Sequence, residues 1–381
     1  MAGNVRQPID ISALSEYVRE NVPLIKLPIS LKQFSHGQSN PTYEVTSSVG
    51  SRFVLRKKPP GSSLSKSAHR IEREYQVIQA LEHTDVPVPK TYCFCEDPSV
   101  IGSPFYIMEF LDGRIFEDPW LPDLTSAERT TIWKEAVRTL RKVHSVHLSD
   151  IGLGGWKKPA SFYSRQLKSL GRVSDAQART IHPSTGQEVG QLPHYDELVS
   201  FFATQRFQPA DRRTLVHGDF KLDNLVFHKT KPEVIGILDW EMATEGHALS
   251  DLVNLTSPFL WTAGQVPLLT ELALTDDLKE LQAKCSAGDI PGLPGFDQCR
   301  VWYKDGAGSD IGGQEDIDWA VAFSNFRTAV VMQGIAARFV NGQASGVKAK
   351  EFASQTVPYA LWAQARVQMI KQKREQPLGK L

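Results

Sequence analysis

The sequence predicts an α+β fold with two lobes: a small N-terminal β-sheet lobe with one main helix and a larger, mostly helical C-terminal lobe. The chain has 381 residues, which is more than one hydrophobic core usually organises. Extended segments dominate up to about Leu111, and helical spacing dominates after it. We therefore expect two domains, 1–111 and 112–381.

The first lobe is predicted from alternating short extended runs and helical runs. The expected elements, in chain order, are a helix over 11–21, a hairpin of strands 43–46 and 52–56, a main helix over 67–84, and strands within 86–97 and 104–113. Ile71, Tyr75 and Ile78 share one face of the main helix, so this face is expected to pack on the sheet.

The second lobe is predicted from three long runs at helical spacing. These runs cover 126–147, with Ser126 as the expected N-cap, 316–343 and 349–376. Between them, 174–193 is polar and interrupted by Pro and Gly, and 288–315 is rich in Gly, Pro and Asp. Both are expected to be loops at the surface.

Composition excludes several classes of protein. Lys plus Arg and Asp plus Glu both number 43, so bulk charge does not favour nucleic-acid binding. No apolar run approaches the roughly 18 residues of a membrane span. Four cysteines in this length indicate reduced thiols and an intracellular, cytoplasmic location. The final Gly379-Lys380-Leu381 is close to the Ser-Lys-Leu peroxisomal address but lacks its serine, so the peroxisome stays an alternative.

The segment "HGDFKLDN", 217–224, followed by a strand, a turn, a strand and "LDWE", has the spacing of a phosphate-transfer site. Transfer of a nucleotide's terminal phosphate needs positioning and charge neutralisation more than covalent chemistry. Asp219 is the expected base that accepts a hydroxyl proton. Asn224 and Asp239 are the expected ligands of Mg²⁺, which prefers hard oxygen donors.

Other polar residues of this segment have less specific predictions. Lys221 could reach the transferred phosphate, and His217 is expected to brace the loop rather than transfer protons. Glu241, two residues past Asp239, either binds a metal-linked water or braces the site. Asp223 shapes a turn, which is the ordinary role of Asp and Asn between strands.

The chain resembles the aminoglycoside phosphotransferase and choline kinase family, whose fold is related to that of protein kinases. Within it, the chain is most similar to the kinase-like domain fused to some long acyl-CoA dehydrogenases. "GQSNPTY", "FVLRKKPPG", "SAHRIEREY", "GSPFYIMEF", "HGDFKLDNLVFH" and "LDWEMATEGHALSDL" carry the resemblance over roughly 30–365. It implies a protein-kinase-like fold, ATP and Mg²⁺ as cofactors, and a small-molecule hydroxyl as the acceptor.

The resemblance also implies an ion pair that contacts phosphate. Arg56 stands where the family usually has a lysine, and Lys57 or Lys58 could share its role. Glu74 corresponds to the helix glutamate that pairs with this cation, and Glu72 is the competing residue. Helical spacing alone favours an exposed Glu74, so this assignment depends on the resemblance.

The remaining nucleotide contacts implied by the resemblance use the backbone or apolar side chains. They are the phosphate-loop residues Gln38, Ser39 and Asn40 and the hinge residues Met108, Glu109 and Leu111. The loop contains Gly37 as its one glycine, so as a local motif it is weak.

The helix over 316–343 is the expected lining of the acceptor site. Arg327 and Gln333 are its candidate polar contacts, and Arg338 is a further one. Arg327 and Gln333 are six residues apart and so do not share a helical face. The alternative is a core helix whose Arg stems extend to solvent.

The function predicted from these features is an ATP- and magnesium-dependent transfer of phosphate to a hydroxyl of a small molecule, with a hydroxyacyl-CoA as a candidate acceptor. A catalytically silent nucleotide-binding scaffold is one alternative, and an aminoglycoside- or choline-type kinase is another. A protein kinase is disfavoured, because neither "DFG" nor "APE" follows the loop. The oligomeric state stays open.

Overall fold

The computed structural model describes residues 2–3, 7–34, 40–59, 71–156, 160–183, 185–260, 290–305, 311–341 and 353–375. The chain divides into two compact units. Unit 1 comprises Met1–Leu121, Val146–Gly155 and His217–Thr244; unit 2 comprises Pro122–Ser145, Trp156–Val216 and Glu245–Leu381. Contacts thus group His217–Thr244 with the N-terminal residues, whereas the predicted boundary at 111 assigned it to the second lobe. The division of nucleotide and acceptor binding between two lobes stays a prediction.

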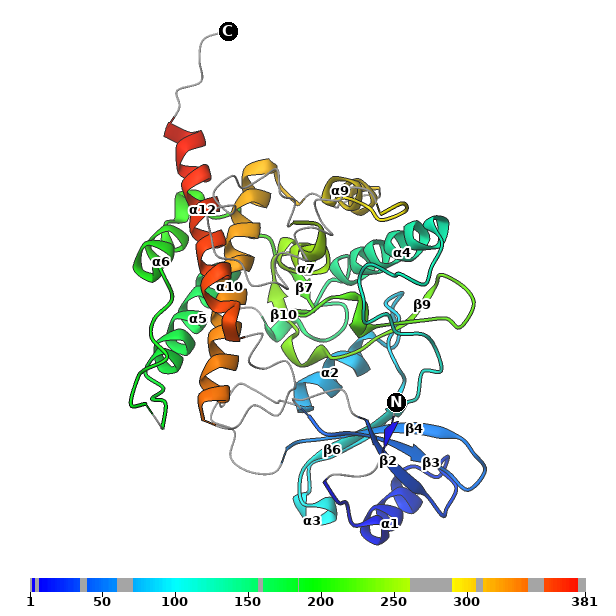
Figure 1. The fold of residues 1–381 in the computed structure, drawn as a ribbon. Helices are drawn as coiled ribbons and strands as arrows, with labels where there is room; N and C mark the ends of the chain where they lie inside the picture. Colours follow the sequence, from blue (N-terminus) through cyan, green and yellow to red (C-terminus); the bar gives the residue numbers. More distant parts are fainter. Residues whose placement is uncertain are drawn as a thin grey trace. The chain divides into compact units, whose positions relative to one another are not determined.

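Unit 1 is built on a six-stranded antiparallel sheet with the strand order β1-β2-β3-β4-β6-β5 (Figure 1). Its strands are β1 (Ala2–Gly3), β2 (Ser30–Phe34), β3 (Thr42–Thr46), β4 (Arg52–Lys57), β5 (Thr91–Cys95) and β6 (Phe105–Glu109). The register pairs Thr46 with Arg52 across the turn between β3 and β4. The predicted hairpin is therefore confirmed.

The two faces of this sheet have different partners, because successive side chains of a strand point to opposite sides. Phe53 and Leu55 belong to the core cluster that the sheet forms with α1 (Ile11–Asn21) and α3 (Pro98–Ile101). Arg56, on the opposite face of β4, contacts Glu74 of α2 (Ile71–Leu81). The sheet thus separates an apolar core from a face that carries buried charge.

Within unit 1, a second hairpin follows the motif segment. It consists of β8 (Leu225–Phe227) and β9 (Val234–Ile237), and 3-10 turns lie before it and after it, η3 (Leu222–Asn224) and η4 (Trp240–Met242). Ile237 N–H donates to the Pro87 carbonyl at 2.9 Å, and η4 packs against α2. These contacts hold the hairpin against the α2 side of unit 1.

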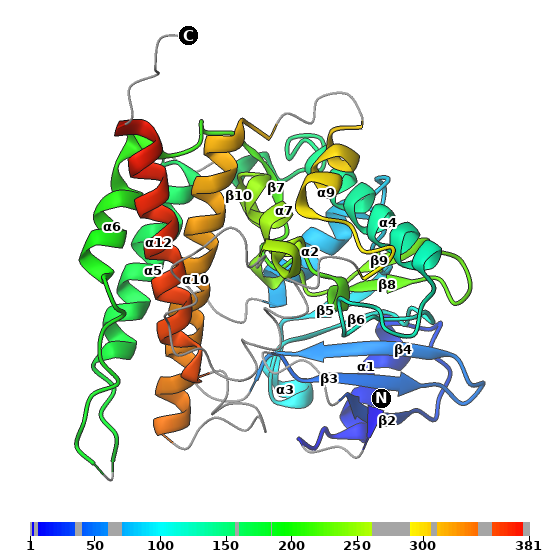
Figure 2. The ribbon, with the colours of Figure 1, turned by 45° about the horizontal axis from the view of Figure 1, so that its top comes forward.

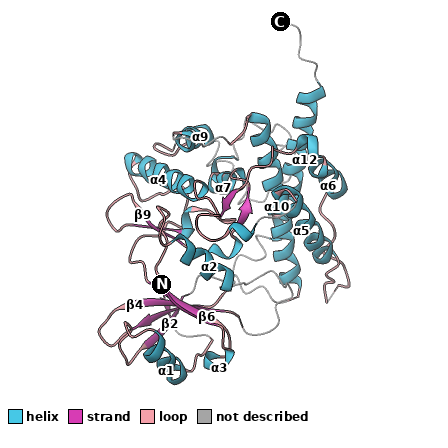
Figure 3. Cartoon of the chain, turned by 180° about the vertical axis from the view of Figure 1, so that it is seen from behind, coloured by secondary structure: helices cyan, strands magenta, loops and turns pink. Residues whose placement is uncertain are grey.

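Unit 2 is mostly helical (Figures 2 and 3). Its helices are α4 (Ser126–His144), α5 (Phe162–Ala178), α6 (Tyr195–Ala203), α7 (Leu249–Leu255), α9 (Phe296–Lys304), α10 (Gln314–Val340) and α12 (Thr356–Glu375). Shorter elements of unit 2 are the strand β7 (Thr214–Val216) and the turns η2 (Gln205–Phe207) and η5 (Ser257–Leu260). Two more, the turn η1 (Gly154–Trp156) and the strand β10 (Thr244–Gly246), which pairs with β7, begin in unit 1 and end in unit 2 along the chain. Helices α5, α6, α10 and α12 pack side by side, with Trp319, Phe323 and Phe202 in their common core.

Three local predictions for unit 2 were wrong. Phe296–Lys304 forms a helix inside the segment predicted as loop, because Cys299 and Tyr303 are buried there, and the helix packs on α4. Helix α5 extends to Ala178, into the predicted polar excursion. The N-cap of α4 is Thr125 rather than Ser126, and Thr125 forms a reciprocal capping box with Glu128.

No helix in the described part of the chain is both long enough and apolar enough to cross a membrane.

Candidate active site

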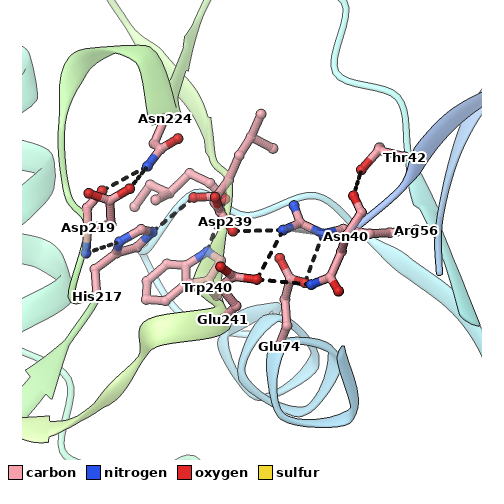
Figure 4. Close-up of polar contacts among 12 residues, drawn as sticks. Asn40, Thr42, Arg56, Glu74, His217, Asp219, Asn224, Asp239, Trp240 and Glu241 are labelled. Carbon is pink, nitrogen blue, oxygen red and sulfur yellow. Dashed lines mark hydrogen bonds and ion pairs between the residues drawn. The ribbon is translucent and has the colours of Figure 1, made fainter. Parts of the chain in front are cut away.

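Asp219 lies in the loop that follows β7, and its position is fixed by a network with Asn224. The Asn224 Nδ2 donates to the Asp219 carbonyl at 2.8 Å and to its Oδ2 at 3.1 Å (Figure 4). About a third of the Asp219 side chain, 34%, is exposed. The carboxylate is therefore held by its neighbours and still open to solvent, as a base that must reach an acceptor requires.

The β8–β9 hairpin brings Asn224 and Asp239 together although they are far apart in sequence. Leu225 pairs with Ile237, and Leu238 N–H donates to the Asn224 carbonyl at 2.9 Å. One side chain thus comes just before the first strand and the other just after the second. Antiparallel pairing must place such flanking positions close together.

Asp239 has a left-handed backbone conformation, with φ 65° and ψ 58°. Asp and Asn tolerate this region better than most residues, but it still carries strain. Figure 4 shows Asp239 between the Asp219–Asn224 pair and Arg56. The local turn into η4 therefore directs this carboxylate toward the other charged groups.

His217 forms hydrogen bonds with both ends of the motif segment. Its Nδ1 accepts the Asp219 backbone N–H at 3.2 Å, and its Nε2 lies 2.9 Å from the Leu238 carbonyl. Because Nδ1 accepts, Nε2 carries the proton and donates. The ring is fully buried, with its centroid 4.6 Å from that of Trp240. This side chain joins the Asp219 loop to the segment that carries Asp239.

Lys221 supplies a cation beside the Asp219 carboxylate. Its Nζ lies 3.5 Å from Asp219 Oδ2 and 3.3 Å from Asp223 Oδ2. Burial opposes the charge of Lys221, but the two carboxylates outweigh burial and raise its pKa. The ammonium thus stays charged beside the Asp219 carboxylate.

Arg56 is the centre of a buried charge cluster. Its guanidinium lies 3.1 Å from Glu74 Oε2, 2.8 Å from Asp239 Oδ1 and 3.7 Å from Glu241 Oε2. The exposed side-chain fractions of Arg56 and Glu74 are 8% and 1%. The expectation that Glu74 is exposed on helical spacing alone is wrong, because the long-range partner Arg56 draws it inward. Between the two candidate glutamates, Glu74 contacts Arg56, and the more exposed Glu72 lies 3.9 Å from Lys58.

One guanidinium cannot neutralise three carboxylates. Burial would lower the pKa of Arg56, but the carboxylates, that of Glu74 foremost, raise it. Burial raises the pKa of Glu74 to about 7, against the opposing effect of Arg56 and with help from Asp239 and Glu241. The cluster therefore has an excess of negative charge, which a divalent cation would offset.

The donor set of this site fits Mg²⁺. Asp239 offers a carboxylate whose side chain is 29% exposed, and Asn224 offers an amide oxygen. Mg²⁺ keeps several waters and usually takes one or two carboxylates together with substrate phosphates. No group of three or more His, Cys, Asp or Glu side chains that could hold a metal ion occurs in the described ranges.

The predicted nucleotide contacts are placed in part. Gln38 and Ser39 lie outside the described residues. Met108 is buried on β6 and pairs with Val54, which places it on the same sheet face as Arg56. Glu109 ends β6, and its side chain accepts the Lys90 N–H at 3.1 Å. Leu111 follows two residues later and packs over Gly236.

Sequence reasoning gave Asn40 a backbone role and missed its side chain. Asn40 is fully buried, and its Nδ2 donates to Glu241 Oε2 at 2.9 Å. The position next to a Pro and just before a strand marks the backbone as ordered. The local sequence cannot predict a hydrogen-bond partner that lies 201 residues away.

The two predicted acceptor contacts both lie on α10 in unit 2, but in different environments. Arg327 is half-buried. Gln333 is fully buried: it accepts from Ser174 Oγ at 2.8 Å and donates to the Gly190 carbonyl at 2.8 Å. These bonds give Gln333 a packing role between α10 and α5, and we do not carry it further as an acceptor contact.

Gly218→Ala should lower stability more than another left-handed glycine does. Gly218 has φ +89°, and an added Cβ would lie 2.8 Å from the Met242 carbonyl oxygen. The strain of such positions is about 1–3 kcal/mol, and the clash adds to it. Gly102→Ala is the control, since Gly102 has φ +83° with nothing within 4 Å. Urea denaturation measures both, and equal losses would show that the Met242 contact does not matter.

Comparison with known proteins places this chain in a family. The model of the phosphotransferase enzyme family matches residues 30–282, which is more than half of the chain. The chain belongs to this family. The kinase-like fold and the small-molecule kinase class expected from the sequence are thereby confirmed.

Two relatives and one solved structure of the same fold are similar to this phosphotransferase. Acyl-CoA dehydrogenase family member 11 of Gallus gallus is 35% identical over 337 residues, covering 87% of this chain and 40% of that protein. A solved candidate aminoglycoside phosphotransferase of Ralstonia eutropha JMP134 is 33% identical with a TM-score of 0.76, covering 95% of this chain and 99% of that chain. Spectinomycin phosphotransferase, solved with ADP and spectinomycin, is 12% identical with a TM-score of 0.53 over 94% of this chain and 100% of that chain, and so shows the fold alone.

The phosphotransferase spans less than half of the length of the curated relatives that it matches, 40% for the Gallus gallus protein.

Proposed function

We propose that the protein transfers the terminal phosphate of ATP to a hydroxyl of a small molecule, with Mg²⁺ as its metal. The observation that carries this proposal is the gathering of Asp219, Asn224 and Asp239 beside the buried Arg56–Glu74 ion pair in unit 1. A base, two oxygen ligands and a phosphate-binding cation are the parts that this reaction needs.

Asp219 has the role of base. Its carboxylate orients the acceptor hydroxyl and takes its proton as the oxygen attacks phosphorus. The new bond joins the acceptor oxygen to the terminal phosphorus, the bond from that phosphorus to the bridging oxygen breaks, and ADP leaves. Asn224 holds Asp219 through two hydrogen bonds, so little reorganisation is needed during attack.

Cations of the chain stabilise the phosphates. Arg56, oriented by Glu74, would contact the phosphate chain, and Lys221 would contact the transferred group from beside Asp219. Asn224 and Asp239 would hold Mg²⁺, which when bound supplies positive charge to the phosphate oxygens. In Glu241, also considered as a metal ligand, one carboxylate oxygen already accepts from Asn40.

Nucleotide binding is supported by the fold. Spectinomycin phosphotransferase, of the same fold, was solved with ADP. In this chain, Met108 is buried on β6 and Glu109 ends that strand. The Met108 side chain and the backbone of Glu109 and Leu111 would contact the base. The backbone of Gln38, Ser39 and Asn40 would contact the phosphates.

The acceptor that we propose is a hydroxylated acyl chain, carried as its CoA thioester. The support is the similarity to acyl-CoA dehydrogenase family members, which are 35% identical to this chain over the matched part. Arg327 on α10 is the acceptor contact that we carry forward, because guanidinium groups bind the phosphates of CoA well.

The test is incubation with terminally labelled ATP, Mg²⁺ and a panel of acceptors. The panel holds hydroxyacyl-CoA thioesters with the hydroxyl at different carbons, the same acyl-CoAs without a hydroxyl, choline, sugar alcohols and aminoglycosides. Mass spectrometry should show phosphate gained by one hydroxyacyl-CoA and by no unhydroxylated acyl-CoA. Turnover of choline, sugar alcohols or aminoglycosides alone would reject the acyl acceptor. Nucleotide binding without any product, including from fractionated metabolites, would favour a silent scaffold.

A further inference from the structure

Asn40 and Glu241 form a contact between the end of the phosphate loop and the segment that carries Asp239. Asn40 is fully buried, its Nδ2 donates to Glu241 Oε2 at 2.9 Å, and 201 residues separate the two (Figure 4). Both belong to unit 1. The bond therefore closes a long loop of chain at the place where phosphate is expected to bind.

The orientation of the Asn40 amide follows from its partner. A carboxylate only accepts hydrogen bonds, so Asn40 must present Nδ2 to Glu241. Its Oδ1 is then buried without a hydrogen-bond partner among the described residues. Burying an unpaired polar atom is unfavourable, and a hydrogen bond to a charged group is among the stronger ones available to offset it.

The backbone around Asn40 is held as firmly as its side chain. Thr42 Oγ1 donates to the Asn40 carbonyl at 3.0 Å. The next residue, Pro41, has a fixed φ, and its carbonyl accepts the Lys57 N–H of β4 at 3.0 Å. Asn40, just before β3, is therefore held in place through both its backbone and its side chain.

Glu241 stands between Asn40 and the charge cluster. Its Oε2, the atom bonded to Asn40, lies 3.7 Å from Arg56 Nη2, and the same nitrogen lies 2.8 Å from Asp239 Oδ1. Glu241 is 15% exposed, about half the 29% of Asp239. Of the two carboxylates, Asp239 is the more accessible to a metal with its waters, and Glu241 is the one bonded to Asn40.

We propose that the Asn40–Glu241 hydrogen bond is a latch that fixes Asn40, just before β3, against the metal-binding segment. Glu241 is then a positioning residue that acts through Asn40, and not a ligand of Mg²⁺. This inference rests on the proposed function, because it assigns the latch a role in binding Mg²⁺ and ATP.

An exchange of the two groups tests the latch. Asn40→Asp sets two carboxylates against each other and should weaken binding of a non-hydrolysable ATP analogue with Mg²⁺ by about 10–100-fold, the effect of losing a hydrogen bond to a charged group. Glu241→Gln keeps an acceptor for Asn40 and should weaken binding less than Asn40→Asp. The double variant Asn40→Asp/Glu241→Gln restores an amide–carboxylate pair with the original charge, and should recover most of the loss. Calorimetry measures each affinity.

The Mg²⁺ requirement separates the latch from a metal ligand. Titration with Mg²⁺ should give the double variant a half-saturation close to that of the wild type, whereas Asp239→Asn should need much more metal. Glu44→Gln is the matched control: it removes a carboxylate from β3 and should not alter binding. Additive losses in the double variant, or a raised Mg²⁺ requirement that the exchange does not correct, would overturn the latch. If the wild type itself bound no nucleotide, the proposed function would fail instead.

Discussion

Asp219→Asn is expected to lower kcat by about 10²–10⁴-fold, the usual contribution of a positioned general base. The substituted amide can still accept the Asn224 Nδ2 bond seen at 3.1 Å, so the loop should keep its structure. It cannot take up the proton of the acceptor. The affinity for ATP with Mg²⁺, measured by calorimetry, should change little, because the proposed metal ligands Asn224 and Asp239 are retained.

Asp223→Asn is the matched control for this prediction. Asp223 lies on the same loop and contacts the same Lys221 Nζ, at 3.3 Å, and its side chain is 39% exposed. Initial rates of phosphate transfer to the identified acceptor should fall far less in this variant than in Asp219→Asn. Near-normal turnover of Asp219→Asn, or equal losses in both variants, would contradict the role of Asp219 as base.

Arg56→Met is expected to lower the free energy of unfolding by about 3–5 kcal/mol. This is the usual effect of leaving buried charges without their partner. The substitution keeps an apolar chain of similar length but leaves Glu74, Asp239 and Glu241 without their shared cation. The loss should be greater at pH 8 than at pH 5. The raised pKa of Glu74, about 7, means that its carboxyl takes up a proton at the lower pH.

Lys58→Met serves as the control on the same strand end. Its Nζ is 3.9 Å from Glu72 Oε1, and both side chains are more than a third exposed, at 40% and 35%. Exposed ion pairs contribute less than about 1 kcal/mol, so urea denaturation should show a small loss. A larger loss of stability for Lys58→Met than for Arg56→Met would contradict the conclusion that Arg56 is the main cation of the cluster.

Much of the site could be predicted from local sequence. The sequence predicts a hairpin, because Asp219 and Asn224 are followed by a strand, a turn, a second strand and Asp239. The flanking residues of such a hairpin lie close together, and the pairing of β8 with β9 agrees with this. The bracing role of His217 also follows from its place beside Asp219. These features depend on contacts between residues near in sequence, or on one hairpin, which backbone pairing rules describe.

Other features could not be predicted, because they depend on partners that only packing brings near. Helix α9 forms in a segment rich in Gly, Pro and Asp because Cys299 and Tyr303 are buried against α4. The helical spacing around Gln333 cannot predict the hydrogen bond that Ser174 donates to it from another helix. Propensity and periodicity describe one element at a time, and tertiary burial overrides both.

The sequence by itself determined the phosphotransferase motif, the hairpin that joins Asn224 to Asp239, and the small-sheet and helical composition of the two lobes. Only the tertiary structure decided that Glu74 is buried on Arg56 and that the Asn40 side chain contacts Glu241. The physical reason is that a buried charge or amide is stable only with its partner. That partner lies on another strand or loop, at a distance in sequence that no local pattern records.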